Sequence, residues 1–326
     1  MFSNYVKNSL ACLIGIVGLS AMSVQAQSNY PTRPIKMIVP YATGGGSDIL
    51  ARAIGAKLQV LWGQGIAIEN RPGASGNIGT EAVVHAPSDG YTLVMQNSTM
   101  VGSAAISGKL NYDPEKDLTP IMVLGLTPMS IVASESSKIK NLKDLVAYSK
   151  ANPNSLNYGS CGIGSPQHIL MELVKFETGV KANHIVYKGC APAVTDVVGG
   201  QVQLAVVSAN LVSQYVKTGR LQSVGISTAK RYNLMPQSLT FAEQGLKSID
   251  DSIWYALMGP ANLPPEIVKK WQTEVTKILA DPAVRENLSN AGVEAYDGNP
   301  YDLGNLIKTD LAKFGKLVKS ANIKAE

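Results

Sequence analysis

The segment from residue 35 to residue 61 constrains the fold of this chain more than any other. Residues 35–41 form an apolar run typical of a buried strand, and three glycines follow at residues 44–46. Apolar residues then recur at helical spacing up to Leu61, and Ser47 or Asp48 lies where an N-cap is expected. This pattern of strand, glycine turn and helix start indicates either an ordinary α/β connection or an anion site made by free helix amides.

The rest of the chain alternates predicted strands and helices. Strands are expected at residues 121–126 and 131–133, and a second glycine loop at residues 159–165 leads into a helix over residues 166–178. This alternation predicts an α/β fold. Because loops at the carboxyl ends of parallel strands meet at one edge of a sheet, we expect the ligand contacts there.

The first 26 residues have the features of a signal peptide. Lys7 is followed by an apolar stretch over residues 10–19 and by Val24-Gln25-Ala26, which predicts cleavage after Ala26 and export to the periplasm. The apolar stretch is short for a membrane span, and a lipid on Cys12 is disfavoured because the apolar region follows the cysteine. No later segment is expected to cross a membrane.

Composition excludes several classes of function. About 300 residues remain after cleavage, enough for two domains. The net charge of +5 becomes 5 − 1 = +4 without Lys7, and the basic residues are scattered, so nucleic acid is not an expected partner. The three histidines, at positions 85, 168 and 184, show no metal-ligand spacing, and no cofactor motif is found.

Several loops, taken in order, resemble one family. The loops at residues 38–45, 69–79 and 89–93, then Tyr158, His168, residues 187–189 and 199–202 and Trp254, look like the Bug-type extracytoplasmic solute receptors. These are the substrate-binding proteins of tripartite tricarboxylate transporters. The resemblance covers nearly all of the predicted mature chain.

The resemblance implies a two-lobed periplasmic binding protein of type II that closes on a small organic anion. Lobe one would hold residues 27–125 and 251–326, and lobe two residues 126–250. The protein would be a monomer without catalytic activity, cofactor or metal, and it would deliver a carboxylate to the membrane subunits of the transporter. A receptor that feeds a signalling partner would have the same lobes, and this alternative stays open.

Ligand-binding residues follow from the resemblance by position. They are Tyr41, Thr43, Gly44, Gly45, Asn97, Ser98, Thr99, Ser160, Gly162, Ser165, His168, Tyr187, Lys188 and Ser208. Two positions depart from the family pattern. Thr43 stands where many relatives have proline, and Val207-Ser208 stands where many have Asp-Asn, a pair suited to an ammonium group. We therefore expect dicarboxylates, then tricarboxylates and aromatic acids, before amino acids.

Some of these residues have a purely structural interpretation as well. Asp48 is expected to cap a helix, Ser160 and Ser165 can cap as well as bind, and His168 can pack as readily as bind. A Cys161–His168 hydrolase dyad is the best enzyme alternative, and it needs a free thiol.

The two cysteines of the predicted mature chain, Cys161 and Cys190, follow strands of one lobe in a protein expected in an oxidising compartment. We predict a disulfide between them. The competing interpretation is a pair of buried, reduced cysteines.

Overall fold

The computed structural model describes residues 30–107, 110–296, 298–299, 301–320 and 323. The predicted signal peptide and its cleavage site after Ala26 lie outside the described residues. Within the described part of the chain, no helix is both long and apolar enough to cross a membrane.

The strands are linked in the order β2-β1-β3-β9-β4-β7-β5-β6, and β8 and β10 also pair with β4. The first half of this arrangement contains β1 (Ile35–Val39), β2 (Ile66–Asn70), β3 (Thr92–Asn97) and β9 (Ser252–Pro260). β1 is parallel to β2 and β3, and β9 runs antiparallel to β3. The helices of this half are α2 (Gly46–Trp62), α3 (Asn77–Val84) and α4 (Thr99–Ser107).

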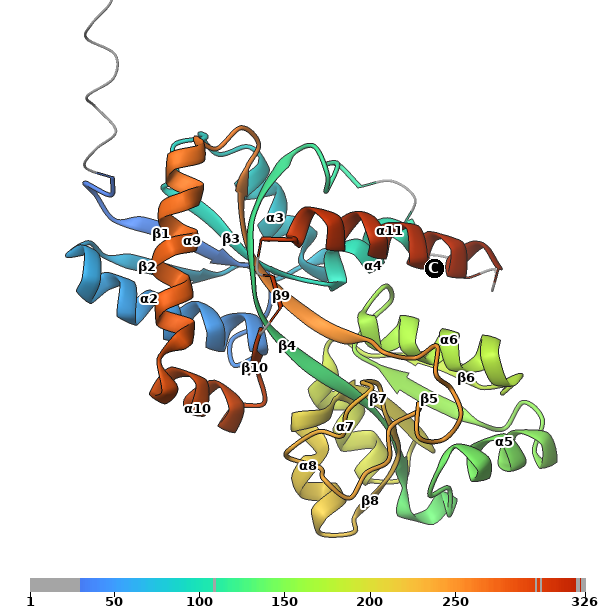
Figure 1. The fold of residues 1–326 in the computed structure, drawn as a ribbon. Coiled ribbons are helices and arrows are strands. Elements are labelled where there is room, and N and C mark those ends of the chain that lie inside the picture. The colour runs from blue at the N-terminus through green and yellow to red at the C-terminus, as the bar shows by residue number, and fades with distance from the viewer. Residues whose placement is uncertain (1–29, 108–109, 297, 300, 321–322, 324–326) are drawn as a thin grey trace, which may run out of the picture.

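The second half contains β5 (Asn157–Ser160), β6 (Asn183–Val186), β7 (Leu204–Ser208) and β8 (Leu221–Ile226). β5 is parallel to both β6 and β7. Its helices are α5 (Leu142–Ala151), α6 (Pro166–Thr178), α7 (Cys190–Val198) and α8 (Ala209–Lys217). Figure 1 shows the two halves as separate bodies, which we call lobe one and lobe two, joined by β4 and β9.

Strand β4 (Leu118–Ser134) belongs to both lobes. Residues 118–128 pair with β9, whereas residues 129–133 pair with β7. The prediction of two separate strands at residues 121–126 and 131–133 was therefore wrong. Pro128 lies between the two predicted strands, at the point where β4 changes partner from β9 to β7. The predicted lobe boundaries at residues 125/126 and 250/251 stay a prediction; the first lies inside β4 and the second just before β9.

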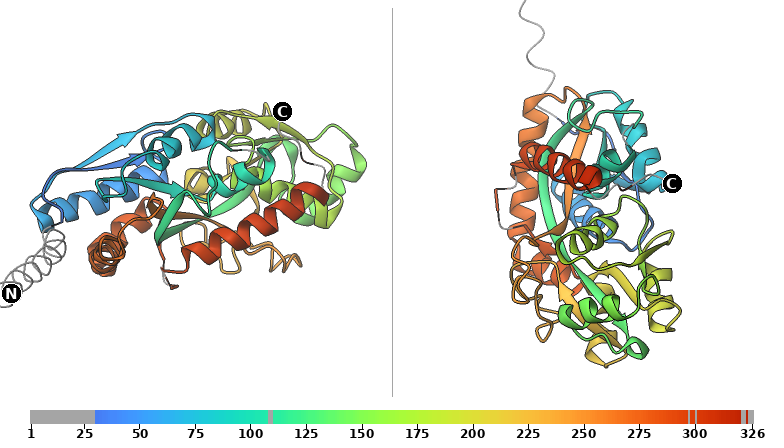
Figure 2. Two further views of the ribbon diagram at one scale, coloured as in Figure 1. Left: turned by 90° about the horizontal axis from the view of Figure 1, so that it is seen from above. Right: turned by 90° about the vertical axis from the view of Figure 1, so that its right-hand side faces the viewer.

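The chain ends on lobe one. Its last elements are α9 (Pro265–Ala280), α10 (Pro282–Asn290), β10 (Glu294–Ala295) and α11 (Leu303–Ser320). Helix α11 contacts α4 and β4 and also α6 of lobe two, and the views in Figure 2 show it along one side of the molecule.

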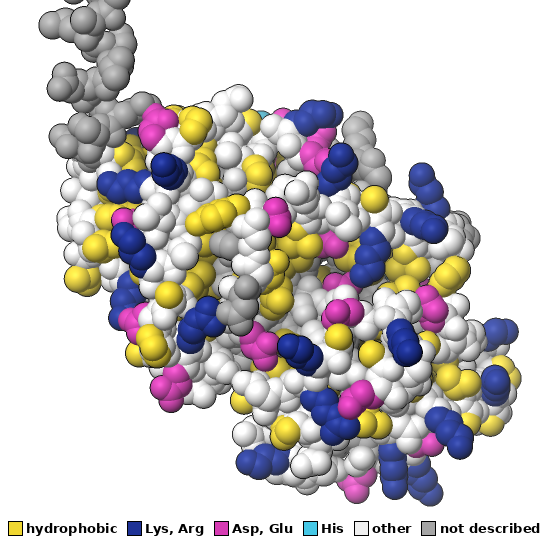
Figure 3. Space-filling model, viewed as in Figure 1, with side chains coloured by type: hydrophobic (Ala, Val, Ile, Leu, Met, Phe, Trp, Pro, Cys, Tyr) yellow, Lys and Arg dark blue, Asp and Glu magenta, His cyan; other side chains and the backbone are white. Residues whose placement is uncertain are grey.

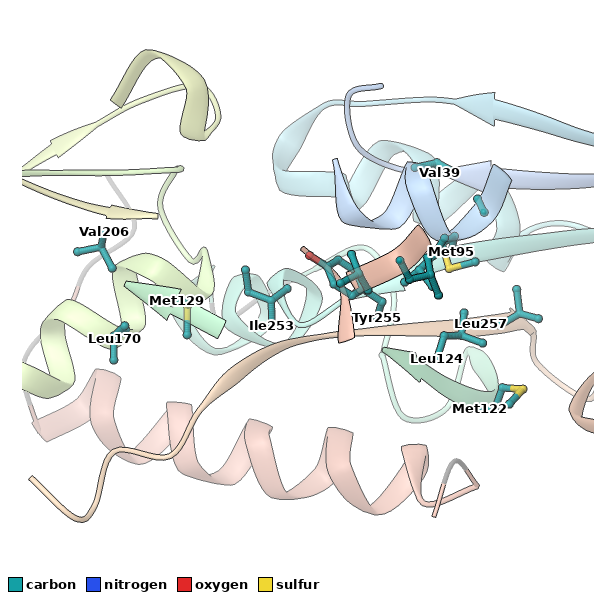
Figure 4. Packing of buried hydrophobic residues seen from close by; sticks show 14 of the residues in the cluster. Val39, Met95, Met122, Leu124, Met129, Leu170, Val206, Ile253, Tyr255 and Leu257 are labelled. Atoms are coloured by element: carbon teal, nitrogen blue, oxygen red, sulfur yellow. The ribbon is translucent and has the colours of Figure 1, made fainter. Parts of the chain in front are cut away.

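One apolar core runs through both lobes. Figure 4 shows Met95 and Leu257 in lobe one, Leu170 and Val206 in lobe two, and Ile253 between the two groups, and all belong to one buried cluster. Side chains of β9 connect the two ends of this cluster, because β9 leads from one lobe into the other.

Candidate functional site

The predicted ligand-binding residues lie in loops at the carboxyl ends of strands. β1 and β3 supply these loops in lobe one, and β5, β6 and β7 supply them in lobe two. Strands β5, β6 and β7 are mutually parallel through β5, so their loops share one edge of lobe two.

The glycine loop before α2 is exposed at Thr43, Gly44 and Gly45. The N-cap of α2 is Gly45, so the prediction of Ser47 or Asp48 as the cap was wrong. Asp48 instead lies in the first turn and accepts the Gly44 amide at 2.9 Å. Gly44 has a φ of +85°, a conformation that favours glycine, and this bends the chain back over the helix end.

The carboxylate of Asp48 is hydrogen-bonded to this loop and to two neighbouring side chains. Burial opposes its ionisation, but hydrogen bonds from Arg52, from the Gly44 amide and from Asn70 outweigh burial and hold its pKa below the usual value. Asp48 therefore stabilises the start of α2 from its first turn and not as the N-cap, and the expectation that it does not contact ligand stays a prediction.

The turn from β3 into α4 carries a hydroxyl group that has no partner. Asn97 accepts the Thr99 amide at 2.8 Å through its side chain and lies 3.4 Å from the Ser47 hydroxyl. Ser98 lies between Asn97 and Thr99 in the sequence; it is 2% exposed, and its Oγ has no hydrogen-bond partner. An unpaired buried hydroxyl costs about 1–3 kcal/mol, so a hydrogen-bond acceptor placed at this group would remove an energetic cost.

Tyr41 is held beside the same turn. Its hydroxyl donates to the side chain of Gln96, which in turn donates to Thr80 at 2.8 Å. Burial raises the pKa of Tyr41 above its usual value, so the phenol stays protonated and remains a donor. The sequence did not single out Gln96, because nothing local marks an inward-facing glutamine at a strand end.

In lobe two, the hydroxyls of the loop after β5 are used internally. Ser160 is fully buried, and its Oγ lies 2.7 Å from Nε2 of His184. Ser165 is the N-cap of α6, accepts the His168 amide at 3.2 Å and donates to the Gly162 carbonyl at 2.7 Å. The expected helix over residues 166–178 is confirmed as α6. The ligand role of Ser160 and Ser165 stays a prediction.

Three stacked rings lie next to this loop. The ring centroids of His168 and His184 are 4.2 Å apart, and those of His184 and Tyr158 are 4.8 Å apart. Burial lowers the pKa of His168 and of His184 to about 4; Lys175 adds a smaller lowering for both, and for His184 the neighbouring His168 also lowers the pKa while Glu172 opposes the change. His168 is thus neutral, and its Nδ1 accepts the Gly164 amide at 3.3 Å. Sequence reasoning missed His184, whose partner Ser160 is 24 residues away.

The remaining predicted residues lie around α6 and α7. The Tyr187 hydroxyl donates to Asp196 at 2.5 Å, and burial raises the pKa of Tyr187 to about 12. Lys188 is exposed, and the Ser208 hydroxyl accepts from Gln167 at 3.4 Å. A disulfide joins Cys161 to Cys190 and so links the loop after β5 to the start of α7. Two loops of the predicted site are therefore covalently connected.

Tyr255 is a further side chain that the sequence did not indicate. It lies on β9, is 5% exposed, and packs under the start of α2, where a Cβ on Gly46 would overlap its ring. In Figure 4 its hydroxyl points away from the lobe one core, toward the side where lobe two lies. Strand β9 itself was not predicted, and Tyr255 was missed with it.

Two surface hollows lie away from these loops. One, of about 270 Å³, is lined by β4 and by residues 228–232, and the other, of about 320 Å³, is lined by residues 140–141 before α5, by β8 and by residues 237–239. Neither includes a predicted ligand residue. Among the described residues, no group of histidines, cysteines and carboxylates could hold a metal ion. On the face in Figure 3, basic and acidic side chains are interspersed.

Comparison with known proteins now decides the family. Residues 50–323 match the model of the tripartite tricarboxylate transporter family receptor. The chain belongs to this family. It is 31% identical to protein BugT of Bordetella pertussis over 317 residues, which cover 97% of each chain. The predicted resemblance to Bug-type receptors is confirmed.

Solved structures agree with this assignment. The periplasmic binding protein BugD is 29% identical and superposes with a TM-score of 0.80 over 91% of this chain and all of that one. R. palustris Rpa4515 with adipate is 31% identical, with a TM-score of 0.82 over 90% and 99% of the two chains. MatC from Rhodopseudomonas palustris, with bound malate, is 28% identical with a TM-score of 0.79 over 89% and 100%. The predicted two-lobed α/β fold is confirmed, and the chain is a solute receptor of this transporter family.

Proposed function

We propose that this receptor captures a small dicarboxylate in the periplasm and delivers it to the membrane subunits of a tripartite transporter. The mature protein would begin at Gln27 and act as a monomer. Ligand would lie between the loops at the ends of β1 and β3 in lobe one and those at the ends of β5, β6 and β7 in lobe two.

The buried hydroxyl of Ser98 is the observation that carries this proposal. Its Oγ has no partner, and it lies beside the first turn of α4, where the positive end of the helix dipole favours negative charge. A carboxylate oxygen placed there would accept from the hydroxyl and would be stabilised by the helix dipole. Neutral donors of this kind suit an anion without any buried cation.

The relatives support the same ligand class. Adipate and malate, the ligands in two homologous structures, are both dicarboxylates. The position of Val207 in β7 agrees with such a ligand, because an apolar residue offers nothing to an ammonium group. An amino-acid ligand is therefore less well supported than a dicarboxylate.

The enzyme alternative is poorly supported by the same structure. A Cys161–His168 dyad needs a free thiolate, and Cys161 is in a disulfide. His168 already uses Nδ1 to accept the Gly164 amide. A receptor for a signalling partner would bind ligand in the same way and differs only in what it docks to.

The substitution Ser98→Ala tests the proposal. Calorimetry with adipate and malate should show wild-type binding, and the variant should bind about tenfold more weakly, which corresponds to one hydrogen bond to a charged group. Without ligand the variant should unfold no more easily than wild type, because an unpaired hydroxyl has been removed. Tyr232→Phe is the matched control, since Tyr232 also has a buried, unpartnered hydroxyl but packs in an apolar cluster of lobe two away from α4. Equal losses of affinity in both variants, or no wild-type binding of either acid, would contradict the proposal.

A further inference from the structure

Besides the connections that strands β4 and β9 make, the lobes are in contact through a pair of glycines. Gly164 of lobe two lies against Gly102 and Ser103 of α4. A Cβ built on Gly102 would overlap the Gly164 carbonyl oxygen and lie 3.2 Å from its carbonyl carbon. A Cβ built on Gly164 would lie 3.1 Å from both N and Cα of Ser103. Backbone packs directly on backbone, and only residues without Cβ allow so close an approach.

Apolar and polar contacts continue on both sides of this glycine pair. The Ser75 hydroxyl of lobe one donates to the Ile163 carbonyl at 3.5 Å. Ile169 of α6 belongs to the same buried cluster as Met100 and Val101 of α4, and Ile163 packs against that cluster. Lobe two is thus packed on α4 over a continuous surface.

Lobe two itself holds Gly164 in the position for this contact. Gly164 has a φ of +74°, and its amide donates to Nδ1 of the buried His168. The next residue, Ser165, is tied to the Gly162 carbonyl. Since these bonds lie within lobe two, the position of Gly164 does not depend on contacts with lobe one.

The contact also lies on the helical turn that carries Ser98. The Gly102 amide donates to the Ser98 carbonyl at 3.3 Å, so the two residues are one turn apart. When Gly164 rests on Gly102, lobe two is held next to the unpartnered Ser98 hydroxyl. Closure and the proposed carboxylate contact are therefore made at one place.

We propose that the packing of Gly164 on Gly102 stabilises the closed arrangement of the lobes, and that Gly102 sets ligand affinity without contacting ligand. This inference rests on the proposed function. A ligand shifts a population only by its preference for one arrangement, so a residue that disfavours the closed arrangement weakens binding in proportion.

The test is the substitution Gly102→Ala, compared with Gly315→Ala. Both place alanine in a helix, where it is intrinsically favoured over glycine, but a Cβ on Gly315 of α11 meets nothing within 4 Å. We expect the dissociation constant for adipate or malate to rise about tenfold in Gly102→Ala and not in Gly315→Ala. We expect a larger radius of gyration by small-angle scattering for Gly102→Ala with saturating ligand, with unfolding by urea unchanged.

The outcomes separate this inference from the proposed function. If the wild type binds neither acid, the proposed function fails. The radii of gyration of ligand-free wild type and ligand-free Gly102→Ala then decide the inference, and equal radii overturn it. If the wild type binds and Gly102→Ala matches it in affinity and radius, the inference alone is overturned. Should Gly102→Ala not fold, as judged by circular dichroism, Ile163→Ala removes part of the same contact. It should weaken binding in the same direction, and unchanged binding overturns the inference.

Discussion

Replacing both Cys161 and Cys190 by serine removes the one covalent link between two loops of the predicted site. The two cysteines are 29 residues apart in sequence, and their Cα atoms are 4.3 Å apart. Both are half-buried, so the serines add little cost of burying polar groups. The expected effect is therefore the effect of the link itself.

Its magnitude follows from the length of the closed loop. For the separation of 29 residues, the chain-entropy relation gives about 12 cal/mol/K, or about 3.6 kcal/mol at 25 °C. Native hydrogen bonds from the Gly189 amide to Cys161 and from the Tyr187 amide to Ser160, at 3.2 and 3.3 Å, hold the loops together without the link. We therefore expect the folded double variant to keep its loop geometry and to lose about 2–4 kcal/mol of unfolding free energy.

Urea denaturation of three samples measures this loss: oxidised wild type, wild type with a reductant, and the double serine variant. The second and third should unfold at the same lower midpoint, and the variant should not respond to the reductant. Affinity for the carboxylate should fall in both, because the loops are less preorganised. Equal midpoints in all three samples would refute the reasoning. Two titratable thiols per chain in unfolded, unreduced protein would exclude the disulfide.

Two further predictions concern buried polar groups. Because the pKa of His168 is lowered from 6.5 to about 4, the unfolded state binds more protons between these values. The stabilising effect of the neutral imidazole is complete above pH 6.5 and should be lost as the pH falls toward 4. Denaturation of wild type and His168→Gln across this range should show a smaller loss in the variant, and parallel curves would contradict it. In Trp254→Phe, the buried Asp310 loses the indole donor at 2.8 Å, which should lower the unfolding free energy measured in urea by about 1–3 kcal/mol. Burial already raises the pKa of Asp310 to about 6, and the loss of the donor should raise it further. An unchanged urea midpoint would contradict this expectation.

The elements that the sequence predicted best carry their signals locally. α6 begins at Pro166 with Ser165 as its N-cap and ends at Thr178 with Gly179 as its C-cap, and each of these residues acts within one helical turn. Strand β9 and the helices α4 and α8 were missed. In β9 every residue from Ile253 to Pro260 is buried, and a continuous apolar run fits a buried strand and a buried helix segment equally well. Helix α4 follows polar residues whose pattern is typical of a loop, so no helix was predicted there.

Sequence by itself determined the α/β class, the family and the order of the loops at the strand ends, because these depend on local patterns and on motifs in a fixed order. Only the tertiary structure decided which hydroxyls are available. Ser98 and Ser160 look alike in sequence, yet the Ser160 hydroxyl is hydrogen-bonded to His184 from a neighbouring strand, while the Ser98 hydroxyl has no partner. Whether a buried hydroxyl is satisfied depends on residues that folding brings together from distant positions, and a local pattern contains no record of them.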